Sequence, residues 1–224
     1  MRSLPLPLAL TVRVMPVVVL ATAGWALSSG PLATTTTAEH KTTESPQKDN
    51  NSATAPSTSA ASKTYTASPA PCTGVTEKTV TSLVPGARTA GQEIPSTDKS
   101  LRRTCSWNAL KGYDYRWLDV SYEIKATDGA AATAYKERTG EKGGGGPVPG
   151  LGDEGYSVVN LTTDKKQQTR EGLVMVRASN ALVIITYNGS DFETQKAPGT
   201  DEINKGAIKA AKDAVAALED GRKS

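Results

Sequence analysis

Two cysteines, Cys72 and Cys105, are the first candidates for chemically reactive side chains. An even number of cysteines in a chain with an export signal is typical of a disulfide. Loop closure between these positions would stabilise the fold by roughly 4 kcal/mol. The alternative is two unrelated buried thiols. Cysteines joined in a disulfide cannot bind a metal ion, so we predict a structural role for both.

A second set of reactive side chains consists of acids. Two carboxylates that converge could hydrolyse a glycosidic or ester bond, and the candidates are Asp153, Glu154, Asp191 and Glu193. Acids in turns more often face solvent or accept hydrogen bonds from backbone N–H groups. The only histidine, His40, lies in a polar N-terminal stretch, which removes Ser-His-Asp and Cys-His catalysis and zinc sites with histidine ligands. We therefore predict no catalytic residues and no metal site.

Glycine motifs follow in the middle of the chain. Residues 150–155 match Gly-x-Gly-x-x-Gly, but a dinucleotide site needs a strand before this motif and a helix after it. A Pro/Gly loop precedes it here and a Tyr-Ser-Val-Val run follows, which indicates a turn that enters a strand, and no cofactor. The preceding run of glycines lacks the Gly-Lys-Ser/Thr of a phosphate loop. We predict instead a binding loop made of Gly143, Gly144, Gly145, Gly146, Asp153 and Glu154.

Four aromatic residues lie close together in the sequence: Trp107, Tyr113, Tyr115 and Trp117. We expect Trp107 to pack on the disulfide and the others on a sheet. The alternative is an aromatic-lined pocket. We expect a groove near the polar segment that precedes Cys105 and near the glycine loop.

The spacing of apolar residues predicts the helices and strands that hold these side chains. Apolar residues at helical spacing predict a helix over 72–84 with Thr73 as its N-cap. Alternation predicts a half-buried strand over 118–125, and the apolar centres of 172–179 and 181–187 predict two central strands. A short helix after Asp128, strands at 104–107 and 156–161, and a last helix over 201–219 complete the order α-β-β-α-β-β-β-α. The fold class predicted is α+β, a single antiparallel sheet with helices packed mainly on one face and one disulfide, over residues 72–221.

The chain before this domain has two parts. Residues 1–33 are apolar with early arginines, which predicts a signal peptide or a single membrane anchor. The run 14–27 is short for a membrane span, but no cleavage site is strong, so both readings stay open and the retained anchor is slightly favoured. Residues 34–71 are rich in Ser, Thr, Ala and Pro and predict a disordered linker. No cysteine precedes Cys72, so a lipid-modified cysteine is not expected.

The formal net charge of +3 is small, and basic and acidic residues are interspersed along the chain. A nucleic-acid-binding domain carries a basic patch. We therefore expect no nucleic acid partner.

Together these motifs resemble a known family. Pro71-Cys72, Cys105-Ser106-Trp107, Gly150-Leu151-Gly152-Asp153-Glu154, a hairpin ending at Asn180 and an Ala-rich terminal helix resemble an actinobacterial family of secreted proteins and lipoproteins of unknown function. That family is also similar to the extracellular sensor domain of some mycobacterial receptor serine/threonine kinases. The resemblance implies a Cys72–Cys105 disulfide, an α+β fold and a cell-envelope location, and it brings no catalytic residues. The missing lipid-attachment cysteine is a departure from the family pattern.

The sequence thus predicts a non-catalytic, extracytoplasmic ligand-binding or sensing module of the bacterial cell envelope. An N-terminal segment would hold it near the membrane, and its partner would be an envelope ligand or protein. Two alternatives stay open, a secreted carboxylate-dependent hydrolase and an envelope protein–protein interaction domain.

Overall fold

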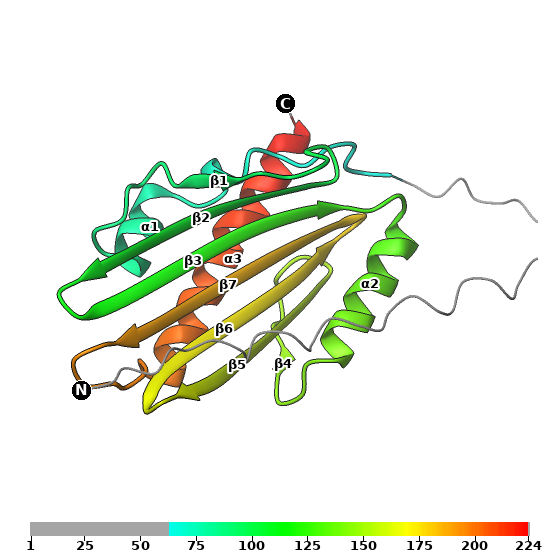
Figure 1. Ribbon diagram of the computed structural model, residues 1–224. Coiled ribbons are helices and arrows are strands. Elements are labelled where there is room, and N and C mark those ends of the chain that lie inside the picture. The colour runs from blue at the N-terminus through cyan, green and yellow to red at the C-terminus, as the bar shows by residue number, and fades with distance from the viewer. Residues whose placement is uncertain (1–62, 224) are drawn as a thin grey trace, which may run out of the picture. The chain divides into compact units, whose positions relative to one another are not determined.

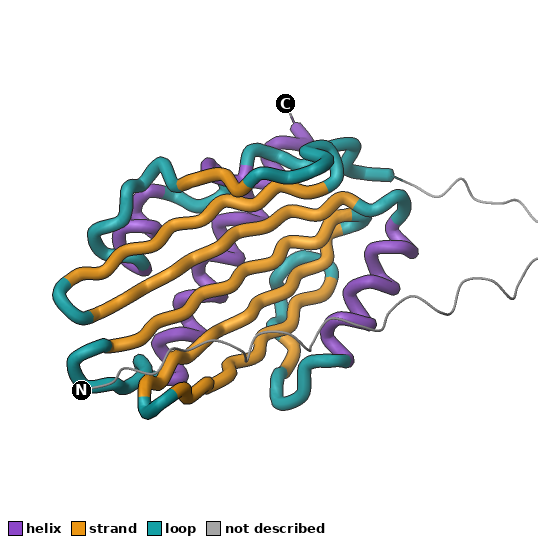
Figure 2. The backbone as a smooth tube through the Cα atoms, viewed as in Figure 1, coloured by secondary structure: helices purple, strands orange, loops and turns teal. Residues whose placement is uncertain are grey.

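The central element of the fold is a seven-stranded antiparallel sheet (Figure 1), seen in a computed structural model that describes residues 63–223. The predicted signal or anchor, residues 1–33, and most of the predicted linker lie outside the described residues. In spatial order the strands are β1 (Gln92–Ile94), β2 (Arg102–Lys111), β3 (Asp114–Ile124), β7 (Ala181–Asp191), β6 (Gln167–Ala178), β5 (Glu154–Asp164) and β4 (Gly146–Pro147). The long strands lie side by side, with short β1 and β4 at the two edges (Figure 2).

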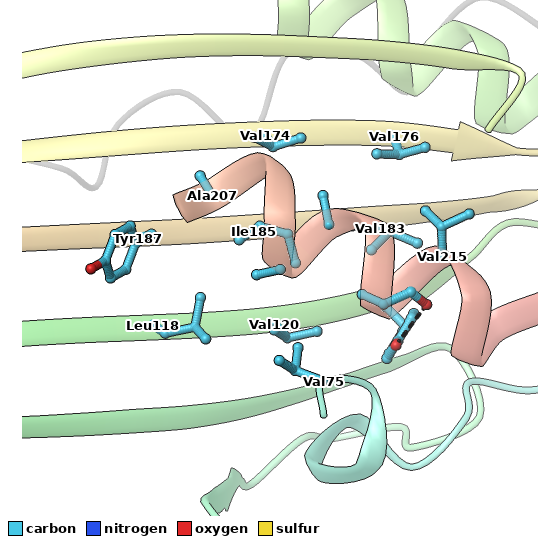
Figure 3. Packing of buried hydrophobic residues seen from close by; sticks show 14 of the residues in the cluster. Val75, Leu118, Val120, Val174, Val176, Val183, Ile185, Tyr187, Ala207 and Val215 are labelled. Atoms are coloured by element: carbon cyan, nitrogen blue, oxygen red, sulfur yellow. Dashed lines mark hydrogen bonds between the residues drawn. The ribbon is translucent and has the colours of Figure 1, made fainter. Parts of the chain in front are cut away.

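One face of the sheet carries the main core. A 3₁₀ turn (Pro71–Thr73), α1 (Glu77–Leu83) and the long helix α3 (Thr200–Lys223) lie on this side. Small residues of α3 such as Ala207 let the helix approach the strands closely. Figure 3 shows the aliphatic side chains that fill the space between them: Leu118, Val120, Val174, Val176, Val183 and Ile185. Successive strand residues point to opposite faces, so this core uses every second residue.

Among the described residues, a single helix packs on the other face. Helix α2 (Asp128–Gly140) packs Ala131 and Tyr135 on Met175 of β6 and Leu182 of β7. Strands β6 and β7 are therefore apolar on both faces, as predicted. The α+β class, the antiparallel sheet and the packing of helices mainly on one face are confirmed.

Several element boundaries differ from the prediction. Cys72 lies in the 3₁₀ turn, and α1 starts only at Glu77, where the Thr76 hydroxyl rather than Thr73 accepts the N-cap hydrogen bond from Thr79 N. Gly146 and Pro147, predicted to lie in a loop without regular structure, pair with β5 as a two-residue strand. A proline is tolerated there because an edge strand bonds on one side only.

The disulfide between Cys72 and Cys105 is present and joins β2 to the 3₁₀ turn. Gly91 passes over it with φ +65°, and a Cβ at that position would lie 2.6 Å from both Cys105 Sγ and the Trp107 ring. Trp107 is buried beside the bridge and donates from Nε1 to Thr89 O at 2.9 Å. The prediction that Trp107 packs on the disulfide is confirmed.

The folded part begins before Cys72. Tyr65, which the sequence analysis placed in the linker, is only 7% exposed and belongs to the core cluster. Asn180 holds it through two hydrogen bonds, from Tyr65 N to Oδ1 at 2.7 Å and from Nδ2 to Tyr65 O at 2.8 Å. A segment with the composition of a linker can still dock through one aromatic residue when a buried amide forms hydrogen bonds with the backbone N–H and C=O groups of that residue. Among residues 63–223, no helix is long and apolar enough to span a membrane.

Candidate binding face

No helix of residues 63–223 covers the α2 side of strands β2 and β3. We call this surface, with the adjoining part of β7, the open face. Its side chains alternate with the buried core residues of the same strands. They are Thr104, Ser106, Asn108 and Leu110 of β2, Tyr115, Trp117, Asp119 and Ser121 of β3, and Thr186 and Asn188 of β7.

The register of these strands builds two rows across the open face. In the first row, Asn108 of β2 and Asn188 of β7 lie directly opposite Trp117 of β3. In the second, Ser106 and Thr186 lie opposite Asp119. Side chains that face each other in this way have Cβ atoms about 5 Å apart. Each row is thus a compact group of side chains from three strands.

Most polar groups in these rows have no internal partner. Within residues 63–223, the side chains of Asn108, Thr186 and Asn188 form no hydrogen bond, and Ser106 Oγ is buried without one. Asp119 is the exception, since it accepts from Trp117 Nε1 at 2.7 Å. The open face therefore presents unused donors and acceptors around one aromatic ring.

An aromatic cluster occupies one end of the open face. The Tyr115 ring lies 6.5 Å from Trp117 in an edge arrangement and 6.0 Å from Phe192. Leu110 and Tyr113 are exposed nearby. Sequence reasoning grouped Tyr113, Tyr115 and Trp117 but missed Phe192, the only phenylalanine, because it comes from the distant loop after β7.

A shallow depression of about 570 Å³ occupies the other end. It is lined by Ile94, Pro95, Ser96, Thr97, Asp98, Leu101, Arg102, Thr104 and Asp119. The loop that forms its wall is shaped by Asp98, which accepts hydrogen bonds from Ser100 Oγ and Ser100 N, and these hold the pKa of Asp98 below its usual range. This is the polar segment before Cys105 where a groove was expected. Asp119 joins the depression to Trp117, so the two ends form one continuous surface.

Glu123 of β3 ties α2 to the border of the open face. Its carboxylate is nearly buried and accepts two hydrogen bonds from Arg138 of α2, at 3.0 and 2.8 Å, and one from Lys125 at 2.8 Å. Burial alone would raise the pKa of Glu123, but the bonds from Arg138 and Lys125 outweigh it and hold the pKa below the ordinary value. Glu123 is therefore charged in the folded protein.

Replacing Glu123→Gln is expected to lower the free energy of unfolding by about 2 kcal/mol at pH 7, because charged hydrogen bonds to Arg138 are lost. A carboxyl with a lowered folded pKa stabilises the fold above its unfolded pKa, about 4.3, and that contribution disappears as pH falls through the folded pKa. Urea unfolding at pH 7 and pH 3 should therefore show a gap between wild type and variant that narrows at pH 3. An equal gap at both values would contradict this role for Glu123.

The predicted binding loop lies elsewhere, at the far edge of the sheet. Gly145 passes so close to Tyr156 that a Cβ would lie 2.2 Å from its hydroxyl, and Tyr156 donates to Lys142 O. A smaller depression of about 310 Å³ lies beside it, lined by Tyr135 and residues 147–155. The motif at 150–155 is a turn that enters β5, as expected.

The carboxylates of this loop are both paired with one arginine. Arg177 reaches Asp153 Oδ2 at 3.0 Å and Glu154 Oε1 at 3.2 Å, and Asp153 also accepts from Ser179 N at 2.7 Å. These contacts fasten the β6–β7 turn to the start of β5. The two acids thus have a structural role at this turn.

Asp191 and Glu193, the other acids considered for catalysis, lie at the opposite end of β7. Eleven strand residues separate that end from the β6–β7 turn, a span of roughly 35 Å. Asp191 accepts from the backbone of Thr194 at 2.7 Å and of Glu193 at 3.0 Å, which holds the pKa of Asp191 below its usual range. The structure therefore does not bring the four candidate acids together. In the part of the chain that the structure describes, no three His, Cys, Asp or Glu side chains group as a metal site would require.

Comparison with known proteins adds little. No family model and no curated protein matches the chain. Among solved structures, a protein of Bacteroides thetaiotaomicron is similar over 53% of this chain with 9% identity and a TM-score of 0.33, and the chain spans about half of that protein, 47%. Ara h 8.0201 is similar over 70% of this chain and 93% of its own, with 13% identity and a TM-score of 0.19.

Proposed function

We propose that this protein is a non-catalytic, extracytoplasmic binding module of the cell envelope, held near the membrane by its N-terminal segment, and that its ligand binds the open face. The single observation that carries the proposal is the uncovered half of the sheet. Of seven exposed large apolar side chains among the described residues, six lie on or beside this face: Ile94, Leu101, Leu110, Tyr113, Trp117 and Phe192. Such grouped exposure marks interaction sites.

The disulfide supports an extracytoplasmic location, because such bonds persist in oxidising compartments. The entry point of the chain supports a ligand that lies away from the tether. Tyr65 docks at the β6–β7 turn, whereas Phe192 lies at the other end of β7. A tether that enters at the turn would leave the aromatic end directed outward.

A catalytic alternative finds less support. Asp153 and Glu154 each pair with Arg177, and Asp191 binds backbone N–H groups. A general acid for glycoside hydrolysis needs a raised pKa and a second carboxylate across the substrate. The four acids do not provide that second carboxylate, because Asp153 with Glu154 and Asp191 with Glu193 lie at opposite ends of β7.

A second candidate function, protein interaction, is favoured by the outer edge of β5. Strand β4 pairs with Tyr156 and Ser157 only, so among the described residues no strand pairs with the outer side of residues 158–164. Leu161, the seventh exposed apolar residue, lies in this stretch. An unpaired edge can accept a strand from another chain.

The proposal is tested by native mass spectrometry of the full-length protein after incubation with envelope lipids or with soluble wall fragments. Wild type is expected to retain a component, and Asn108→Arg should reduce retention by about tenfold or more by blocking the open face. The matched control is Thr163→Arg, an exposed position on β5 whose side chain lies on the opposite side of the sheet. Loss only in the control would favour the β5 edge instead. Nothing retained from either pool would end the proposal.

A further inference from the structure

The row formed by Asn108, Trp117 and Asn188 combines one aromatic ring with two amide groups. We propose that the open face binds a neutral glycan, with Trp117 as a stacking platform and the two amides bonded to sugar hydroxyls. This inference rests on the proposed function and names the ligand class for the same site.

Trp117 is suited to stacking because it is exposed yet held in place. It is 37% exposed, its Nε1 is fixed by Asp119, and Tyr115 supports its ring from the side. A fixed aromatic ring buries a large area at low cost in side-chain entropy. The C–H groups on a sugar ring present a weakly positive, apolar surface to the negative face of the aromatic ring.

The amides of Asn108 and Asn188 restrict which ligands can lie on the Trp117 ring. Each amide carries donors and an acceptor, and neither Asn108 nor Asn188 uses them within the described residues. A purely apolar ligand would remove both amides from water without a partner, at a cost in free energy. Hydroxyl groups donate and accept, so a ligand rich in hydroxyls satisfies both. The hydroxyl of Thr186 in the next row extends the same chemistry.

The charge and shape of the open face restrict the class of ligand further. The charged side chain at the centre of the open face is Asp119, which disfavours an anionic ligand, while Arg102, which also lines the depression, is paired with Glu123. From Tyr115 to Ser121 the surface runs along β3 for about 20 Å. An extended, neutral polymer of sugar units fits this strip.

An extended peptide fits the strip less well. Peptides that bind sheets usually add as a strand through main-chain hydrogen bonds at an edge. Here β3 and β7 are paired with strands on both sides. Strand β2 is paired with β3 from Arg102 with Glu123 to Lys111 with Asp114, and the part of its outer edge beyond β1 faces sideways, in the plane of the sheet, rather than out of the open face. The open face therefore offers side chains rather than backbone groups.

The experiment uses the full-length protein and isothermal titration with neutral tetrasaccharides of N-acetylglucosamine, glucose, galactose and arabinose. Tetragalacturonate is the anionic control of similar shape. At least one neutral tetrasaccharide is expected to bind, more tightly than tetragalacturonate. Trp117→Ala should weaken that binding by about tenfold, as should the double change Asn108→Ala and Asn188→Ala. Leu161→Ala, which removes an exposed apolar side chain elsewhere, should leave it unchanged.

The outcomes separate the two proposals. If no neutral tetrasaccharide binds but a component retained from the envelope pools is lost in Asn108→Arg, the glycan class is wrong and the open face remains the site. Binding that survives both Trp117→Ala and the double asparagine variant would overturn the assignment of this row. No ligand in either experiment would overturn both proposals. The double variant alters one exposed and one half-buried side chain, neither with a hydrogen-bond partner among the described residues, so it keeps the test valid if Trp117→Ala fails to fold.

Discussion

Replacing both Cys72 and Cys105 by alanine is expected to lower the free energy of unfolding by about 4 kcal/mol. The disulfide spans a sequence separation of 33 residues. Without the bond, the unfolded chain gains the conformations of this loop that the bond excludes. Folding must then offset the entropy that the bond otherwise removes. Denaturant unfolding of the oxidised protein and of the double variant measures the difference.

Alanine is chosen because it adds no polar group to the site. Cys105 is fully buried beside Trp107, and serine would place an unpaired hydroxyl there. Oxidised wild type treated with a reductant should lose a similar free energy, which separates the bond from the loss of sulfur packing. A difference below about 1 kcal/mol would show that the loop stays ordered without the bond. Because Gly91 rests on Cys105 Sγ, the variant should also loosen the segment that leads to the depression.

The parts of the fold that were predictable carry a strong local pattern. The alternation of Leu118, Val120 and Tyr122 indicated a half-buried strand, and the structure buries all three on the α3 side. The apolar centres of β6 and β7 indicated strands covered on both faces, and α3 and α2 cover them. In both cases the side-chain period alone determines which residues are buried.

The parts of the fold that could not be predicted depend on residues that are distant in the sequence. Strands β1 and β4 have three and two residues, too few to show a period, and each exists because a longer strand pairs with it. The same holds for the candidate site. The aromatic residues of β3 were visible in the sequence, but their flanking amides, Asn108 and Asn188, come from two strands whose register only the folded sheet shows.

Asn180→Ala is expected to lower the free energy of unfolding by about 3 kcal/mol, because three backbone groups, two of them buried, lose their hydrogen-bond partner at once. Asn180 is fully buried, and its side chain bonds Tyr65 N, Tyr65 O and Lys125 O. Tyr65 can respond by leaving the core, which exposes its ring and limits the loss. Thermal or urea unfolding measures the cost, and Asn160→Ala, on the exposed part of β5, is the matched control with a change below about 0.5 kcal/mol.

A truncation shows whether the loss acts through Tyr65. In a protein that starts at residue 72, Asn180 can bond only Lys125 O, so Asn180→Ala should cost much less than in a protein that starts at residue 63. The two changes should therefore be coupled by about 1 kcal/mol or more. Proteolysis of the full-length Asn180→Ala variant should cut within residues 63–70, which the wild type protects through Tyr65 and through the bond from Ser68 N to Ser100 O at 2.9 Å. Additive effects, or equal protection of this segment in both proteins, would mean that the domain begins at Cys72 after all.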